Sequence, residues 1–237
     1  MSNIVVGVAI IFVSILASLL SKIQFPRDAE RTLAKVRDHT LRVGYTNAAP
    51  WVYPAPGGAQ GIEAKIVSDF ANTLHARVDW VEGTEEQLYN ALENDEIDLL
   101  IAGITDKTPW KDKVGLTKPY LETELDVGQP TSQPPGNSES IIEGQWVAVR
   151  KGTAEGYYVR KKKAKPFYTA QLPVSNMFSV GYDWQIQSWN LRNTGIVLKK
   201  ESHVMAVPPG ENAFLLALDK YLFLNKETIR DELNKKE

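Results

Sequence analysis

A turn of polar residues follows an apolar stretch near the middle of the chain. Residues 100–120 read LIAGITDKTPWKDKVGLTKPY, so an apolar run ends at Gly103 and Thr105 and continues into a Thr-Pro-Trp-Lys turn. Thr108 and Lys111 give this turn a hydroxyl group and a cation. Such groups can hold a polar ligand if the apolar run is a central parallel strand, because parallel sheets present ligand sites beyond the carboxyl ends of their strands. The alternative is that Lys111 is an exposed residue at the start of a helix.

No set of residues indicates catalysis or a resident metal. The histidines, His39, His75 and His203, are scattered without the HxH or HxxxH spacing of a zinc site, and the chain has no cysteine. The sequence also lacks a G-x-S-x-G elbow, a P-loop and a G-x-G-x-x-G loop. We therefore expect no catalytic residue, no metal and no cofactor.

Composition and charge favour a globular protein that does not bind nucleic acid. The 237 residues are 43% apolar and 24% charged, enough for one large core or two modest ones. The net charge of -2 offers no basic surface for nucleic acid. The one concentrated basic run, residues 160–163, is interpreted as the solvated end of a helix, where cations complement the helix dipole.

Residues 4–20, IVVGVAIIFVSILASLL, carry no charge and predict a hydrophobic N-terminal helix. Their length is just short of what crosses a bilayer core of about 30 Å. Residues 1–24 are either an uncleaved signal anchor or a signal peptide. The absence of a basic start and of a small-x-small cleavage motif favours the anchor. The cations that follow the segment would instead place the rest of the protein inside the cell, because positive charge tends to remain on the cytoplasmic side. These are Lys22, Arg27, Arg31, Lys35 and Arg37.

Alternating strands and helices follow the connector at residues 25–40. LRVGY, RVDWV and IDLLIA are predicted strands, and apolar residues every four positions over 62–74 predict a helix between the first two. Thr84 and Gln87 have capping-box spacing and predict the start of a second helix. The order strand, helix, strand, helix, strand predicts a parallel α/β lobe. This lobe spans residues 41–122.

A second α/β unit is predicted after the proline-rich loop that ends near residue 137. QWVAV, FYTAQL and FSVGY are its strand candidates, with helices predicted after Thr153 and over DWQIQSWNL, and HVMAV is a further strand candidate before Pro208. Two helices are expected at the end of the chain. We assign residues 123–199 to lobe 2 and residues 200–237 to a return into lobe 1 with the C-terminal helices.

The order of these motifs resembles the bacterial extracellular solute-binding proteins of the polar amino-acid type. The matching stretches are LRVGYTNAAPWVY, GIEAKIVSDFANTLHARVDWV, EEQLYNALENDEIDLLIAGIT, TPWKDKVGLTKPY, WVAVRKGTAEGYYV and HVMAVPPGENAFLLALDKYL. They cover most of residues 41–224 in the family's order. The resemblance implies a two-lobed, type II periplasmic-binding fold preceded by the N-terminal hydrophobic helix.

The resemblance also implies a set of ligand-binding residues. Lys111 occupies the position where the family has an arginine that grips the ligand's α-carboxylate, and Trp51 occupies that of an aromatic against the ligand. Asp183 falls where an acid binds the α-amino group, although a helix N-cap explains it equally. Gly103 and Thr105 would offer backbone and hydroxyl partners. Thr153 would hold an anionic group, or would only cap its helix; Thr108 completes the set.

Three departures from the family pattern weaken these assignments. Lysine at position 111 cannot form the two-pronged guanidinium contact with a carboxylate. Lys65 replaces a frequent aspartate, and Glu63 holds an acidic position that usually faces away from ligand. The usual leucine-and-glycine helix before Asp183 is not recognisable, so lobe 2 is expected to be reduced.

We interpret the chain as a non-enzymatic binding protein that captures a small, carboxylate-bearing ligand such as an amino acid or organic acid. It would be periplasmic, tethered to the inner membrane through residues 4–20, and would serve a membrane permease of an ABC transporter. The alternatives are a sensor or accessory subunit that retains the fold, and an enzyme resembling cyclohexadienyl dehydratases.

Overall fold

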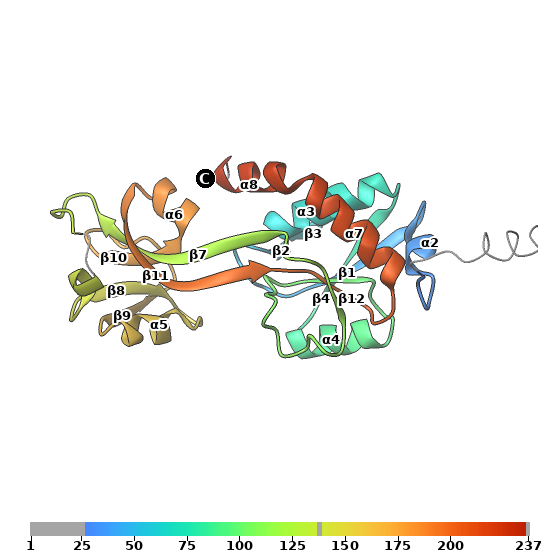
Figure 1. Cartoon of the computed structure of the whole chain (residues 1–237), viewed down its shortest axis with the longest axis horizontal. Coiled ribbons are helices and arrows are strands. Elements are labelled where there is room, and N and C mark those ends of the chain that lie inside the picture. The colour runs from blue at the N-terminus through green and yellow to red at the C-terminus, as the bar shows by residue number, and fades with distance from the viewer. Residues whose placement is uncertain (1–26, 137–138, 236–237) are drawn as a thin grey trace, which may run out of the picture.

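Two lobes, each built on a five-stranded mixed sheet, form the protein (Figure 1). The computed structural model describes residues 27–136 and 139–235. Lobe 1 lies on the right of Figure 1 and lobe 2 on the left, and the two long strands β7 (Leu121–Pro130) and β11 (Leu191–His203) run between them. This arrangement agrees with the predicted two-lobed α/β fold.

The centre of lobe 1 is a parallel sheet, as the alternating pattern predicts. Strand β1 (Thr40–Tyr45) lies between β4 (Arg77–Glu82) and β5 (Leu99–Ile101), parallel to both. Helices α3 (Ile62–Thr73) and α4 (Glu85–Glu93) connect these strands in turn. The predicted capping box of α4 is present: the Thr84 side chain accepts the N–H of Gln87, whose side chain accepts the N–H of Thr84.

Helices cover both faces of this sheet, which explains why β5 is apolar throughout. Leu99 and Ile101 join the core on the side of α3, whereas Leu100 joins the core on the side of α4. Side chains alternate between the faces of a strand, so a central strand needs apolar residues at every position.

The chain returns to lobe 1 after β11. Strand β12 (Ala206–Val207) pairs antiparallel with β5 and with β6 (Gly115–Leu116). Helix α7 (Asn212–Leu224) packs Phe214, Leu218 and Leu222 into the core, and α8 (Lys226–Lys235) lies against α3.

Lobe 2 has the sheet order β11-β7-β10-β8-β9. Its remaining elements are β8 (Trp146–Arg150), β9 (Lys165–Thr169), β10 (Phe178–Tyr182), the short helices η1 (Glu139–Ile142) and α5 (Glu155–Lys161), and α6 (Asp183–Ser188). Strand β11 differs from the prediction, which placed no strand over residues 192–202 and expected the next strand at HVMAV, residues 203–207. Register shifts between Asn193 and Lys199 interrupt its pairing with β7 and therefore its side-chain alternation.

The proline- and glycine-rich segment 47–61 contains a small hairpin instead of a plain loop. Strands β2 (Tyr53–Ala55) and β3 (Gly58–Gln60) pair antiparallel. Gly58 has a φ of 135°, and a Cβ atom there would lie 2.2 Å from Cδ1 of Trp80, so the turn requires glycine at this position.

The connector after residue 26 is fixed to lobe 1 by hydrogen bonds. Oδ1 of Asp28 accepts the N–H groups of Ala213 and Phe214 at 2.6 and 2.9 Å, at the start of α7. Buried Glu211 accepts the N–H groups of Glu30 and Thr32, next to the short helix α2 (Thr32–Val36). Within the described residues no helix is long and apolar enough to cross a membrane. The hydrophobic helix predicted at residues 4–20 lies outside them.

Candidate functional site

An open cleft of about 740 Å³, including solvent at its mouth, lies between the two lobes. Lobe 1 contributes residues 48–51, which precede the β2–β3 hairpin, and the two residues that follow β5. Lobe 2 contributes the end of β8 with the start of α5, the end of β10 with the start of α6, one residue of β7 and the last part of β11. The lining residues are Ala48, Ala49, Pro50, Trp51, Ala102, Gly103, Leu125, Arg150, Thr153, Ala154, Glu155, Tyr158, Tyr182, Gln185, Lys199 and Glu201.

Trp51 forms the wall of the cleft on the side of lobe 1. Its buried indole packs on the His203 ring, with 3.9 Å between centroids, and meets the Tyr182 ring edge-on at 5.3 Å. The indole Nε1 donates to the Tyr182 hydroxyl at 3.4 Å, so this side chain joins the lobes directly. The position of Trp51 makes glycine necessary at 103, where φ is +63° and a Cβ atom would lie 2.6 Å from the indole.

Glu63 fixes Gly103 from behind. Its carboxylate is fully buried and accepts the N–H of Gly103 at 2.9 Å and the hydroxyl of Tyr120 at 2.8 Å. Burial raises the pKa of Glu63 to about 7, although both hydrogen bonds favour the charged form. Because the Gly103 N–H already has a partner, this group is engaged in the fold.

Arg150 and Glu155 place opposite charges side by side in lobe 2. The backbone N–H of Arg150 donates to the Glu155 carboxylate at 2.6 Å, and its guanidinium Nη1 donates to the Ala49 carbonyl of lobe 1 at 3.4 Å. Thr153 donates its hydroxyl to the Arg150 carbonyl at 2.9 Å. Burial raises the pKa of Glu155, whereas the Arg150 N–H and charge lower it. The guanidinium can turn to a ligand, since a single long hydrogen bond holds it among residues 27–136 and 139–235.

A second charged group occupies the floor of the cleft on β11. Lys199 and Glu201 form an ion pair at 2.6 Å, and the Tyr182 hydroxyl donates to Glu201 at 2.8 Å. Burial opposes ionisation of Glu201, but the hydrogen bonds from Lys199 and Tyr182 lower its pKa below the ordinary value. The cleft therefore carries two cations and two carboxylates beside aromatic rings.

His203, behind Trp51, is a buried neutral group. Its Nε2 lies 3.0 Å from the Thr123 hydroxyl, and within residues 27–136 and 139–235 its Nδ1 has no hydrogen-bond partner. Burial lowers the pKa of His203 to about 4, against the attraction of Glu201. A neutral ring suits its stacking contact with the indole.

Three of the seven predicted ligand residues line the cleft, and four lie elsewhere. Trp51, Gly103 and Thr153 are in the lining. Thr108 is buried and bonded to the Tyr89 hydroxyl at 3.0 Å, which ties its turn to α4. The others are Lys111, exposed in that turn, Thr105, bridged through its backbone to His203, and Asp183, exposed at the start of α6.

Sequence reasoning missed all the charged residues of the lining and both of its tyrosines: Arg150, Glu155, Tyr158, Tyr182, Lys199 and Glu201. The first three lie in the recognised stretch WVAVRKGTAEGYYV. Because this stretch joins a strand end to a helix start, its polar residues could have been proposed. Lys199 and Glu201 belong to the unrecognised part of β11, and no signal identified them.

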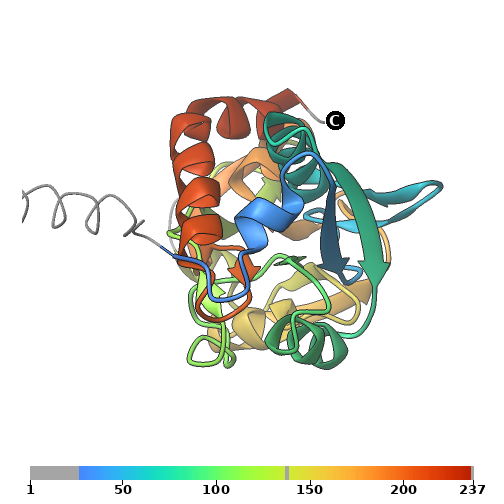
Figure 2. The same ribbon diagram turned by 90° about the vertical axis from the view of Figure 1, so that its right-hand side faces the viewer.

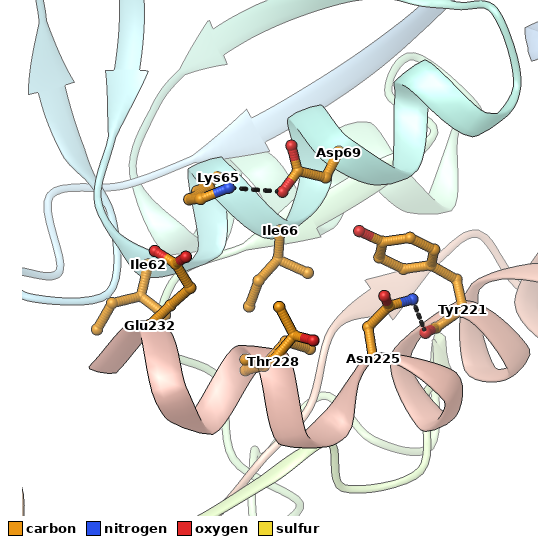
Figure 3. Close-up of a pocket in the computed structure, with 9 residues that line it drawn as sticks. Ile62, Lys65, Ile66, Asp69, Tyr221, Asn225, Thr228 and Glu232 are labelled. Atoms are coloured by element: carbon orange, nitrogen blue, oxygen red, sulfur yellow. Dashed lines mark hydrogen bonds and ion pairs between the residues drawn. The ribbon is translucent and has the colours of Figure 1, made fainter. Parts of the chain in front are cut away.

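A separate hollow lies on lobe 1, between α3 and the two C-terminal helices (Figure 3). Ile62, Ile66 and Ile229 form its apolar part. Its polar groups mostly satisfy each other: Lys65 pairs with Asp69 at 2.8 Å, and the Asn225 amide donates to the Tyr221 carbonyl (Figure 3). The inter-lobe cleft offers more charged groups to a polar ligand, so it is the stronger candidate site.

A family model confirms the resemblance. The model of the bacterial extracellular solute-binding proteins, family 3, matches residues 41–236. The chain belongs to this family. No curated protein matches the sequence.

Solved structures of the family's fold superpose on most of the chain. An ancestral cationic amino acid solute-binding protein has a TM-score of 0.71 at 18% identity, covering 87% of this chain and 97% of that one. The GluR0 ligand-binding core in complex with L-glutamate has a TM-score of 0.61 at 18% identity, covering 83% and 97%. An arginine-binding protein from T. maritima has a TM-score of 0.55 at 21% identity, covering 82% and 93%. These likenesses confirm the two-lobed fold.

Proposed function

We propose that this protein captures a small zwitterionic or carboxylate-bearing solute, an amino acid or a related organic acid, between its two lobes. The observation that carries the proposal is the mixed charge of the inter-lobe cleft. Arg150 offers a guanidinium whose fork matches a carboxylate, and Glu155 offers an acceptor for an ammonium group. Trp51 and Tyr182 supply apolar surface for the ligand's carbon atoms.

Capture would proceed by closure of the lobes. A ligand that touches Arg150 in lobe 2 and the residues beside Trp51 in lobe 1 gains its full set of contacts only when the lobes are together. This difference in contacts shifts the population toward the closed state. The Arg150 bond to the Ala49 carbonyl would then be exchanged for a bond to the ligand.

Binding of this kind would serve a membrane permease, with the protein held at the outer face of the inner membrane by residues 4–20. The family match supports an extracellular or periplasmic solute-binding role. Several similar structures are described as amino-acid-binding proteins. An accessory or sensory role without transport is the second candidate, because the hydrogen bond from Trp51 to Tyr182 itself joins the lobes.

Calorimetric titration against amino acids and organic acids tests the proposal. We expect one class of ligand to bind, and Arg150→Ala to weaken its binding at least tenfold. Lys151→Ala is the matched control, since Lys151 is exposed and does not line the cleft. Lys111→Ala should also leave affinity unchanged, because Lys111 lies outside the lining.

Three outcomes would count against this proposal. Equal affinity of the Arg150→Ala variant and the parent chain would remove the guanidinium from ligand recognition. The absence of binding to every compound would favour the accessory role. Turnover of prephenate would instead indicate an enzyme, and one similar structure is described as a precursor of cyclohexadienyl dehydratase.

A further inference from the structure

Helix α7 is apolar on both of its faces, although only one face is packed. Phe214, Leu218 and Leu222 are buried in lobe 1. On the outer face, Leu216, Phe223 and Leu224 are 53%, 78% and 68% exposed. A helix that is hydrophobic all round is usually covered all round, and large exposed apolar groups clustered on one face mark an interaction surface.

The chain enters the fold beside this helix. Asp28 accepts the N–H groups of Ala213 and Phe214, so residue 28 is fixed on the first turn of α7. The uncharged segment 4–20 ends eight residues earlier in the sequence, and eight residues reach at most about 28 Å. If residues 4–20 enter a membrane, the membrane surface therefore lies within about 28 Å of the start of α7. Helix α7 is itself about 20 Å long, so its whole outer face is within reach of that surface.

Charges of both signs lie on the outer face: Asp219 accepts the N–H of Lys118 at 2.8 Å, whereas the side chain of Lys220 is exposed. Lys220 lies four residues after Leu216 and three before Phe223, which places all three on one side of the helix. Lys226 follows at the start of α8, and neither lysine forms an ion pair within the described part of the chain. Phenylalanine and leucine flanked by lysine is the composition of helices that lie in a membrane interface.

A basic hollow lies at the same end of lobe 1. Arg31, Lys35 and His39 line it, on and after α2, and Figure 2 shows α2 beside α7. Arg31 and Lys35 are its cations, and Lys35 also pairs with Glu30 at 3.7 Å. Their sign complements the anionic headgroups of a phospholipid bilayer, which attract basic segments close to the surface.

We infer that the outer face of α7 rests on the lipid bilayer, with Leu216, Phe223 and Leu224 at the level of the headgroups and Lys220 and Lys226 against lipid phosphates. The inference rests on the proposed membrane tether. It assigns a fixed position to lobe 1 on the membrane and leaves lobe 2 away from it.

Site-directed spin labelling of the full chain in vesicles tests this surface. The chain has no cysteine, so Phe223→Cys and Leu216→Cys each give a single labelling site. Vesicles containing phosphatidylglycerol are floated first, and the label's collisions with oxygen and with a water-soluble nickel chelate are then compared. The matched control is Tyr157→Cys on α5 in lobe 2, where the native side chain is 51% exposed.

We expect labels at 223 and 216 to collide several-fold more with oxygen, relative to nickel, than the label at 157. Failure of the chain to float would overturn the tether and this inference together. Flotation with equal ratios at 223 and 157 would overturn the membrane contact and leave the tether in place. Shielding of the label at 223 from both reagents would show that protein, a second copy or residues 4–20, covers α7 instead of lipid. Melting curves of each labelled chain verify that the fold is retained.

Discussion

Replacement of Glu63 by glutamine should remove a pH-dependent loss of stability. Glu63 is fully buried, with a pKa raised by burial from the ordinary 4.5 to about 7. Between these values the unfolded chain gives up the proton and the native protein keeps it, so stability falls as pH rises through this window. Above pH 7 the native carboxyl also ionises, and the loss stops growing.

The size of this loss follows from the pKa difference. A rise from 4.5 to about 7 corresponds to a penalty of about 3 kcal/mol on the ionised carboxylate, because each pH unit is worth about 1.4 kcal/mol. Glutamine has nearly the same shape, keeps an oxygen for the Gly103 N–H and never ionises. The free energy of unfolding of Glu63→Gln, minus that of the parent, should therefore increase by about 3 kcal/mol between pH 4.5 and pH 8.

Urea unfolding followed by tryptophan fluorescence at several pH values measures this difference. Taking the difference between the two proteins cancels the contribution of other titrating groups, including His203. Glu96→Gln serves as the control for the same chemical change at an exposed site. A flat difference for Glu63→Gln would refute the claim that the native state keeps this carboxyl protonated between pH 4.5 and about 7.

Three further outcomes follow from local geometry. Gly103→Ala should lower the free energy of unfolding by several kcal/mol and weaken ligand binding, because its Cβ would meet Trp51. The control Gly144→Ala, with a φ of +73° and open space around it, should lower that free energy by only about 1 kcal/mol. Equal losses of stability in thermal unfolding would disprove the clash at Gly103. NMR titration of the His203 imidazole should show no protonation until pH approaches 4. Because its pKa is depressed in the folded state, the protein should lose stability as pH falls from 6.5 to 4. A titration midpoint near 6.5 would contradict the burial of this ring. Thr84→Ala should destabilise the protein by about 1 kcal/mol through loss of the helix cap, and no change in urea unfolding would show that the cap is dispensable.

Local signals in the sequence were sufficient to predict most of lobe 1. The strands β1, β4 and β5 and the helices α3 and α4 have clear periodicity and capping residues, and the structure places them as predicted. Periodicity reports which faces are buried, so it works where an element is regular and packs on a single layer.

The same reasoning was weaker where pairing is long-range or irregular. Strand β11 has register shifts that disturb its alternation, and its partner β7 lies far away in the sequence. The turn at Lys111 was assigned to the ligand site from position in a family pattern. In the structure, Thr108 binds Tyr89 and holds that turn against α4, a contact that no local pattern indicates.

Lobe 2 leaves and rejoins lobe 1 through neighbouring residues. Leu121, at the start of β7, is paired with His203, at the end of β11. The segment between these two residues therefore begins and ends at the same place in the structure. A segment whose two ends are adjacent can be replaced by the corresponding segment of another protein without changing the path of the rest of the chain. Because Arg150, Glu155, Lys199 and Glu201 all lie within that segment, the protein's chemical preference could be rewritten by transplanting lobe 2 while lobe 1 and its N-terminal connection stay unaltered.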